Sequence, residues 1–289
     1  MTLAATHLAT TTRNDAPHSL TRLKALLAPL SQAAVAVSGG VDSLTLARIA
    51  HDKLGANVTM YHAVSPAVPA EATERVRSLA ARYTWPLQII DTGEFNSADY
   101  MNNPVNRCFF CKTHLYSAIS AIAHHTSAQI LSGTNTDDLG EYRPGLEAAK
   151  QHDVRHPFVE ADISKAEIRA LARLLGMDDV AELPAAPCLS SRVETGIAID
   201  PKVLARIHAT EKLISETLRP QTVRCRVRAG GIVVELDAAS LLNLSQSVRD
   251  NLTQNITAMF NEIDVAQPVS FAAYRAGSAF LVKPENRTK

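Results

Sequence analysis

Short apolar runs alternate with segments of helical periodicity through the first two thirds of the chain. Ala33 to Val37 is an uninterrupted apolar run with the length of a buried strand. Before it, leucines at positions 20, 23, 26, 27 and 30 share one face of a helix. The full pattern predicts strands at 33–37, 58–62, 87–90 and 130–132, and helices at 19–30, 44–54, 70–83, 103–124 and 165–174. Such alternation predicts an α/β fold with a doubly wound parallel sheet, which binds ligands at the carboxyl ends of its strands.

The pattern changes after a proline-bounded loop at 184–192, in which two prolines prevent a helix. Beyond the loop, Asp200 and Pro201 form a helix start, and the helix runs to about Leu218. Residues 222–228 and 232–236 alternate like a hairpin, and a helix at 239–260 and short strands at 269–272 and 279–282 follow. We therefore expect a disordered tail at 1–18, the α/β domain at 19–192 and a small α+β domain at 193–289.

Charge and composition narrow the choice of partners. The 29 Lys and Arg residues balance 29 Asp and Glu residues, so the broad basic surface of a nucleic-acid-binding protein is not expected. No apolar run approaches membrane-spanning length, and residues 1–17 lack the features of a secretory signal. Four cysteines in 289 residues do not make a disulfide scaffold. These features predict a cytoplasmic protein with no membrane partner.

A glycine turn, SGGVDS at 38–43, joins the first predicted strand to the next helix. A strand, a glycine-rich turn and a helix start aim several backbone N–H groups at one point, which makes an anion site. Gly39 and Gly40 let the backbone approach the anion, and the Ser38 and Ser43 hydroxyls are further donors. Asp42 can hold a metal ion on bound phosphates. The turn fits neither the GxxxxGK[ST] nor the GxGxxG phosphate motif.

A second polar segment follows the strand predicted at 130–132. It contains Gly133, Asn135 and Asp137. In a doubly wound sheet, this strand end faces the same crevice as the glycine turn. We therefore expect these three residues to line the same crevice as the anion site.

The cysteines leave several interpretations open. Cys108 and Cys111 form a CxxC pair at a helix start, and Cys188 lies far downstream in the proline-bounded loop. Zinc prefers four ligands in two close pairs, and a thioredoxin-like redox pair would follow the first strand. An iron–sulfur cluster held by Cys108, Cys111 and Cys188 fits, and so does a buried pair of small side chains at 108 and 111. A nearby cation, Arg192, favours a reactive Cys188, whereas we expect Cys225 to be buried in a strand.

Four motifs together resemble a known family. SGGVDS resembles the PP-loop of the ATP pyrophosphatases, and with NRCFFCK, SGTNTDDLGEYRPG and PCLSSR it is similar to the LarE family. The match runs in order from about Leu20 to Leu236. Members of this family are ATP-dependent sulfur transferases of nickel-pincer nucleotide cofactor synthesis. The resemblance implies that ATP adenylates a carboxylate of pyridinium-3,5-biscarboxylic acid mononucleotide, which then becomes a thiocarboxylate.

The resemblance also implies roles for residues of this chain. ATP phosphates would bind at the glycine turn, with Mg²⁺ on Asp42. In one type of member, a cysteine matching Cys188 gives up its own sulfur. In another, cysteines matching Cys108, Cys111 and Cys188 hold a 4Fe-4S cluster with an extra sulfide, and the three thiols here favour this type. The residues that would contact the substrate are Lys112, Glu141, Arg143, Arg192, Glu211, Arg224 and Arg226.

Some features depart from the family pattern, and other functions compete. Cys225 stands between two arginines, and Val193 to Gly196 differs from the loop expected there. The alternatives are a PP-loop enzyme that thiolates tRNA, a sulfur transferase with a sacrificial cysteine and no cluster, an amide-forming PP-loop ligase or amidotransferase, and a non-catalytic nucleotide- or metal-binding protein. The resemblance implies a small-molecule nucleotide substrate and a homo-oligomer, and it leaves the sulfide donor open.

Overall fold

The structure is a computed structural model, and it describes residues 11–124, 127–140 and 143–281. The chain divides into two compact units, which are described separately. Unit 1 contains residues 1–65, 70–93 and 108–186, and unit 2 contains residues 66–69, 94–107 and 187–289. No helix of the described residues is both long and apolar enough to cross a membrane.

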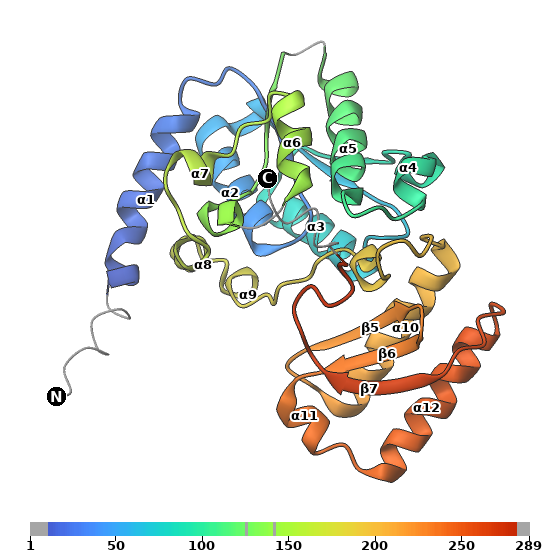
Figure 1. The fold of residues 1–289 in the computed structure, drawn as a ribbon. Helices are drawn as coiled ribbons and strands as arrows, with labels where there is room; N and C mark the ends of the chain where they lie inside the picture. Colours follow the sequence, from blue (N-terminus) through green and yellow to red (C-terminus); the bar gives the residue numbers. More distant parts are fainter. Residues whose placement is uncertain (1–10, 125–126, 141–142, 282–289) are drawn as a thin grey trace. The chain divides into compact units, whose positions relative to one another are not determined.

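Unit 1 is built around a parallel sheet with the strand order β3-β2-β1-β4. Figure 1 draws its helices, from α1 in blue to α9 in yellow. β1 pairs in parallel with β2, where Ala33 lies opposite Val58, and with β4, where Ala33 lies opposite Gln129. β2 and β3 are also parallel, so all four strands point the same way. The predicted α/β fold with a parallel sheet is confirmed. The elements in or bordering this unit are α1 Thr11–Leu27, β1 Ala33–Ala36, α2 Val41–Leu54, η1 Gly55–Asn57, β2 Val58–Ala63, α3 Ala70–Tyr83, β3 Leu87–Ile90, α5 Arg107–Ala123, β4 Gln129–Leu131, η4 Thr136–Gly140, α6 Pro144–Gln151, α7 Pro157–Glu160, α8 Lys165–Leu174 and α9 Asp178–Ala181.

Both faces of β1 are buried, because helices cover both sides of this sheet. Ala33 and Val35 belong to one apolar cluster, which α1, α2, α3, α8 and α9 complete. Ala34 and Ala36 belong to another, to which α5 and α6 contribute. Strands with two covered faces have no polar alternation, which explains the uninterrupted apolar run in the sequence.

The first helix starts earlier than the sequence predicts. We expected a disordered tail through residue 18 and a helix from Ser19, whereas α1 begins at Thr11 and includes Pro17. Ala16 is buried in the core, so the apolar stripe of Leu23 and Leu27 continues toward the N-terminus. Ser19 is also buried, and its hydroxyl donates to Glu167 of α8 at 3.0 Å. The tail prediction is therefore wrong for residues 11–18, and residues 1–10 lie outside the described part.

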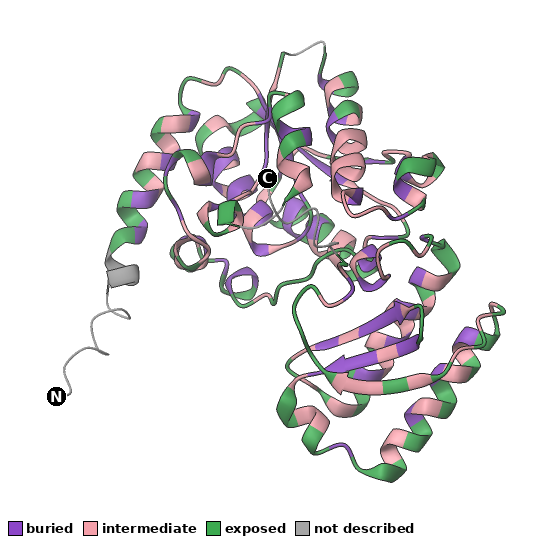
Figure 2. Cartoon of the chain, in the orientation of Figure 1, coloured by how far each residue is buried: buried purple, intermediate pink, exposed green. Residues whose placement is uncertain are grey.

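Unit 2 has a three-stranded sheet with the order β5-β6-β7, in which β5 and β6 are antiparallel and β6 and β7 parallel. Figure 2 shows β5 and β6 mostly buried, whereas β7 alternates between intermediate and exposed residues. Helices α10 and α12 pack with these strands. The elements in this unit are η2 Glu94–Asn96, α4 Ala98–Met101, η5 Leu189–Arg192, α10 Pro201–Leu218, β5 Val223–Arg228, β6 Gly231–Leu236, α11 Ala238–Leu242, α12 Gln246–Asn261 and β7 Val269–Ala273.

Two predicted elements of unit 2 differ from the structure. The helix expected at 239–260 is two helices, because Ser245 accepts a hydrogen bond from the Val248 N–H and starts α12 anew. The strand expected at 279–282 is absent from the described residues 279–281, and Val282 lies outside them. Thr195 instead donates its backbone N–H to the Ala279 carbonyl at 3.0 Å, and its Oγ1 accepts from the Leu281 N–H at 3.2 Å, so side-chain contacts continue where a strand ladder was expected.

The compact units also divide at a different place from the boundary expected after Arg192. The division falls between Ala186 and Pro187, and residues 66–69 and 94–107 join unit 2. Side-chain and backbone contacts explain this arrangement. Leu189 donates its N–H to the Ala67 carbonyl at 2.9 Å, and the Asn103 amide donates to the carbonyls of Glu194 and Ile197 at 2.9 Å each.

Candidate functional site

The glycine turn lies between the carboxyl end of β1 and the first residue of α2. Gly39 has a φ of +85°, and a Cβ there would lie 2.9 Å from the Ala72 carbonyl oxygen. Gly40 is the N-cap residue of α2, and no side chain caps that helix start. The N–H groups at the start of α2 and the positive end of its dipole therefore stay available to an anion.

Hydroxyl groups fix the shape of this turn. The Ser43 Oγ accepts from the Ser38 N–H at 3.1 Å and donates to the Gly40 carbonyl at 3.2 Å. The two serine hydroxyls lie 3.1 Å apart, within hydrogen-bond distance. Arg75 of α3 donates to the Gly39 carbonyl at 2.8 Å, which places a cation at the turn that the sequence analysis missed.

Asp42 is the acidic residue of the turn, and its two carboxylate oxygens differ. Oδ2 accepts a hydrogen bond from the Lys165 ammonium of α8, whereas Oδ1 is buried and has no hydrogen-bond partner among the described residues. Burial raises the pKa of the Asp42 carboxyl, and the Lys165 charge opposes that shift. A buried carboxylate oxygen without a partner is suited to a cation that carries its own oxygen ligands, such as Mg²⁺.

The segment after β4 packs directly on the glycine turn. A Cβ on Gly133 would lie 2.9 Å from the Ser43 nitrogen, so only glycine allows this approach. The Asn135 side chain accepts from the Asp137 N–H, and Asp137 in turn accepts from the Lys165 N–H, each at 3.0 Å. The structure therefore brings the two predicted nucleotide-binding segments together in unit 1.

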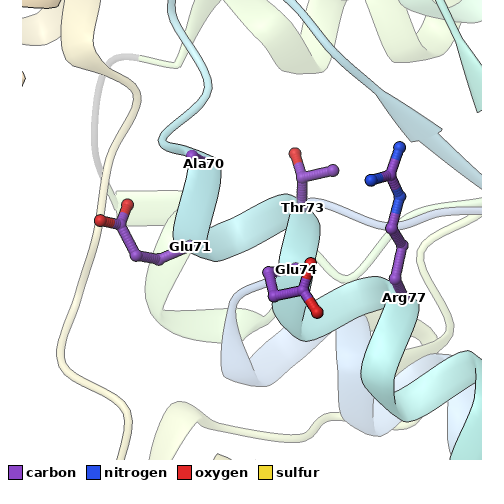
Figure 3. A pocket seen from close by; sticks show the side chains of 5 residues that line it. All are labelled: Ala70, Glu71, Thr73, Glu74 and Arg77. Atoms are coloured by element: carbon purple, nitrogen blue, oxygen red, sulfur yellow. The ribbon is translucent and has the colours of Figure 1, made fainter.

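Helix α3 borders both the glycine turn and a cavity. The cavity measures about 440 Å³ and is lined by Ala70, Glu71, Thr73, Glu74 and Arg77 (Figure 3). Figure 3 shows these side chains extending from successive turns of the same helix.

The buried His62 ties α3 to the end of β1. Its Nδ1 lies 2.8 Å from the Val37 carbonyl, which can only accept, and its Nε2 lies 2.9 Å from the Thr73 Oγ1. Burial lowers the pKa of this imidazole. The same helix, α3, therefore lines the cavity and contacts the glycine turn.

The CxxC pair lies at the start of α5 in unit 1. Cys108 and Cys111 are partly exposed and form no disulfide. The Lys112 ammonium lies 5.7 Å from the centre of the Tyr116 ring, and a Cβ on Gly145 would lie 3.1 Å from the Lys112 Cγ. Arg143, the other predicted cation of this unit, pairs with Asp138 at 2.8 Å. Glu141 lies outside the described residues.

Cys188 is exposed and belongs to unit 2, where Arg192 fixes its loop. The Arg192 guanidinium is almost fully buried and forms two 2.9 Å hydrogen bonds with Glu211. Its Nη1 also donates to the carbonyls of Pro187, at 2.5 Å, and Cys188, at 3.2 Å. These contacts favour a role in holding the Cys188 loop, and a direct role in substrate binding stays a prediction.

More charged residues surround this loop on the β5–β6 hairpin. Arg226 pairs with the buried Glu235 at 3.0 Å and donates to the Ser191 carbonyl at 3.0 Å. Burial lowers the pKa of Arg224, and the nearby charge of Arg192 adds to the shift. Arg192 and Arg226 are each already paired with a buried carboxylate, so a direct role of these arginines in binding an anionic ligand stays a prediction. Cys225 is fully buried, as predicted, and burial raises the pKa of its thiol.

The predicted site residues thus fall into two groups, one in each unit. The thiols of the expected cluster are also divided, with Cys108 and Cys111 in unit 1 and Cys188 in unit 2. Within the described residues of either unit, no three His, Cys, Asp or Glu side chains are arranged to hold a metal ion.

Sequence reasoning missed Lys165 and Glu235 as well as Arg75. Lys165 was visible only as the first residue of a predicted helix, and its partner Asp42 is 123 residues away in the chain. Glu235 could have been noticed, because the hairpin register places it opposite Arg224.

Comparison with known proteins connects this arrangement to a family. No family model matches the sequence. An uncharacterized protein of Synechocystis is 35% identical over 230 residues, which cover 79% of this chain and 85% of that protein. The glutamine-hydrolyzing GMP synthase of Sulfurisphaera tokodaii has a subunit that is 29% identical over 163 residues, which cover 50% of this chain and 43% of that protein.

A relative with a named activity shows the family. The pyridinium-3,5-bisthiocarboxylic acid mononucleotide synthase of Lactiplantibacillus plantarum is 32% identical over 221 residues, which cover 76% of this chain and 79% of that enzyme. On this identity and coverage, the chain belongs to the LarE family, of which that synthase is a member, and it is an enzyme.

Proposed function

We propose that this enzyme is an ATP-dependent sulfur transferase. It adenylates a carboxylate of pyridinium-3,5-biscarboxylic acid mononucleotide and converts it into a thiocarboxylate. The name of the Lactiplantibacillus synthase supports the product, and the similarity to a GMP synthase subunit supports a doubly wound domain of the PP-loop ATP pyrophosphatase type. The observation that carries the proposal is the close approach of Gly133 to the uncapped start of α2 at the glycine turn.

ATP would bind with its phosphates at the glycine turn. The backbone N–H groups of Gly39 and Gly40 and the Ser38 and Ser43 hydroxyls are the donors for phosphate oxygens. The unpartnered Oδ1 of Asp42 fits a Mg²⁺ ligand, and the ion would neutralise charge on the departing pyrophosphate. Gly133, Asn135 and Asp137 support the turn from the neighbouring strand end.

Two bond exchanges then follow. A substrate carboxylate oxygen attacks the α-phosphorus, and pyrophosphate leaves, which gives an acyl adenylate. A sulfur nucleophile attacks the acyl carbon next, forming a C–S bond as the C–O bond to AMP breaks. In the form without a cluster, this nucleophile would be the thiolate of Cys188, which is exposed in a loop that Arg192 fixes. The arginines at 224 and 226 would bind the substrate's phosphate and carboxylate.

The source of the sulfur distinguishes two forms of the proposal. Thiolates are the usual ligands of iron–sulfur clusters, and Cys108 and Cys111 are reduced, partly exposed and one helical turn apart. A 4Fe-4S cluster held by these two and Cys188 would supply a sulfide, and Cys188 must then reach the α5 pair. Without a cluster, a base would remove the Cα proton of Cys188 after thioester formation, and the Cβ–S bond would break. The thiocarboxylate then leaves with the sulfur, and a dehydroalanine remains. We favour the cluster form, and we also propose a homo-oligomer.

One experiment tests the adenylation step. Purified enzyme, substrate and Mg–ATP are incubated under anaerobic conditions, and the nucleotides are separated. We expect AMP and pyrophosphate in equal amounts, with none formed by Asp42→Asn. Release of ADP and phosphate would contradict the assignment of the glycine turn.

A second experiment decides the sulfur source. The enzyme is reconstituted anaerobically with iron and sulfide, and protein mass is measured before and after turnover. The cluster form predicts a brown protein of unchanged polypeptide mass, and Cys108→Ala loses the colour. A colourless enzyme that loses one sulfur atom per turnover would assign the sulfur to Cys188 instead.

A further inference from the structure

The ion pair of Lys165 and Asp42 lies at the centre of the nucleotide site, and neither the proposed reaction nor the sequence motifs assign Lys165 a role. Its ammonium donates to the Asp42 Oδ2 from the first residue of α8. Both side chains are only about one third exposed or less, at 32% and 27%. Asp42 is the residue that would hold Mg²⁺, and the Lys165 ammonium already contacts one of its two carboxylate oxygens.

The backbone of Lys165 is fixed independently of this ion pair. Its N–H donates to the Asp137 carboxylate at 3.0 Å. The preceding Ser164 closes a capping box with Glu167, which holds the start of α8. The ammonium stands on a flexible four-carbon stem, so it can leave Asp42 while the helix start stays in place.

We propose that Lys165 is a counter-ion that Mg²⁺ displaces. In the nucleotide-free enzyme it neutralises Asp42, and when Mg–ATP binds, its ammonium transfers to the phosphate oxygens beside the glycine turn. A divalent cation on Asp42 repels an ammonium at the same carboxylate. The incoming phosphates bring several negative charges to the same place, and a compact ammonium pairs well with them.

This role makes metal and nucleotide binding respond to Lys165 in opposite directions. Lys165 competes with a metal ion for Asp42 when no nucleotide is bound, so removing its charge strengthens metal binding. The same removal takes a cation away from the phosphates, so nucleotide binding weakens. A lysine that only supports the fold would weaken both.

The test compares the full-length wild-type chain with Lys165→Met, which keeps the length of the side chain and removes its charge. Mn²⁺ is titrated into nucleotide-free protein and followed by electron paramagnetic resonance. Binding of a non-hydrolysable ATP analogue with Mg²⁺ is measured by calorimetry. We expect Mn²⁺ to bind about tenfold more tightly and the nucleotide about tenfold more weakly, within the usual range for coupled sites.

Three further variants make the result specific. Lys165→Arg keeps a cation, and its Mn²⁺ affinity should stay near that of the wild type. Asp42→Asn should abolish the tighter Mn²⁺ binding when combined with Lys165→Met, because the ion then lacks its ligand. Arg173 also lies on α8 and forms an exposed ion pair with Glu182, which follows α9, so Arg173→Met should change neither affinity.

Metal and nucleotide affinities that fall together in Lys165→Met, or that both stay unchanged, would overturn the proposal. Tight Mn²⁺ binding that survives Asp42→Asn would also overturn it. The inference rests on the proposed function only in that the site takes Mg–ATP. Wild-type enzyme that binds the analogue but forms no AMP would contradict the proposed function and leave the exchange at Asp42 intact.

Discussion

The glycine turn of unit 1 and the Cys188 loop of unit 2 are held in place by different means. Backbone geometry fixes the turn, because Gly39 and Gly133 approach neighbouring backbone atoms where no Cβ fits. Side-chain charges fix the loop, because Arg192 joins the carbonyls of Pro187 and Cys188 to the carboxylate of Glu211. The first kind of support requires glycine where distant segments of the chain meet, as at Gly133 and Ser43. The second kind requires a matched pair of charged side chains, Arg192 and Glu211.

The largest effect is expected from a substitution that breaks the charged support of the Cys188 loop. Glu211→Ala leaves the buried Arg192 without its bidentate partner, and the Cys225 N–H loses its acceptor at 2.9 Å. Removing one partner of a buried pair lowers stability by about 3–5 kcal/mol. Urea unfolding of the full chain measures this loss of stability. Hydrogen exchange in peptides of α10 and β5 assigns the loss to unit 2.

The matched control is Glu262→Ala, which breaks the exposed pair with Arg206 on the same unit. An exposed pair contributes only about 0–1 kcal/mol, so this variant should stay close to the wild type. Equal losses in the two variants would contradict the view that Arg192 and Glu211 support the loop.

The next prediction breaks the backbone support of the glycine turn. Gly133→Ala places a Cβ 2.9 Å from the Ser43 nitrogen and 3.0 Å from the Asp42 carbonyl carbon, so the strand end must move away from the turn. A displacement near 1 Å can lower the rate of a positioned reaction about 100-fold, and we expect a loss of that order in AMP formation.

Gly140→Ala is the control for this substitution, since a Cβ at Gly140 meets no atom within 4 Å. Both variants exchange glycine for alanine in the segment after β4, so they differ mainly in the space available. AMP formation that is equally fast in the two would show that the close approach at Gly133 is not required.

A milder change sharpens the account of the loop. Arg192→Lys keeps the positive charge beside Glu211 and loses the planar fork that also reaches the two loop carbonyls. We expect sulfur transfer to slow by about tenfold, less than for a full displacement, while the KM for ATP stays unchanged. Alkylation of Cys188 by iodoacetamide should become faster, because the loop is less restrained. Slower alkylation would mean that Arg192 activates the thiol and does not restrain the loop.

The smallest expected effect is on how the stability of unit 1 depends on pH. Burial lowers the pKa of His62 below its ordinary value of 6.5. The unfolded chain therefore takes up a proton at a higher pH than the folded chain does. The stability that follows from this difference is fully present above pH 6.5 and is lost as the pH falls toward the lower folded pKa.

His62→Gln should make the urea midpoint of unit 1 less dependent on pH below 6.5. His18→Gln, at an exposed position of α1, should keep the dependence of the wild type. Hydrogen exchange in peptides of β1 and α3 reports on unit 1 alone. An unchanged pH dependence in His62→Gln would assign it to other groups.

The sequence predicts local structure well where the signal is local. The apolar run from Ala33 and the two glycines after it predict a strand, a turn and a helix start, and the structure has all three. The hairpin around Gly230 was found for the same reason. These elements depend on residues within a few positions of one another.

Contacts between distant residues could not be predicted in this way. Lys165 was visible only as the start of a predicted helix, because nothing near it in the chain indicates Asp42 as its partner. The burial of Ala16 extends α1 beyond its predicted start, and that burial depends on packing with other helices. The membership of residues 94–107 in unit 2 likewise rests on the hydrogen bonds of Asn103 to a loop about 90 residues further on.

The most direct test of the proposed function is the mass of the substrate after reaction. Pyridinium-3,5-biscarboxylic acid mononucleotide is incubated anaerobically with the reconstituted enzyme and Mg–ATP and then analysed by mass spectrometry. We predict a mass gain that corresponds to the replacement of a carboxylate oxygen by sulfur, dependent on ATP and absent in Cys188→Ala. A substrate of unchanged mass, with AMP released and wild-type enzyme correctly folded, would contradict sulfur transfer to this compound.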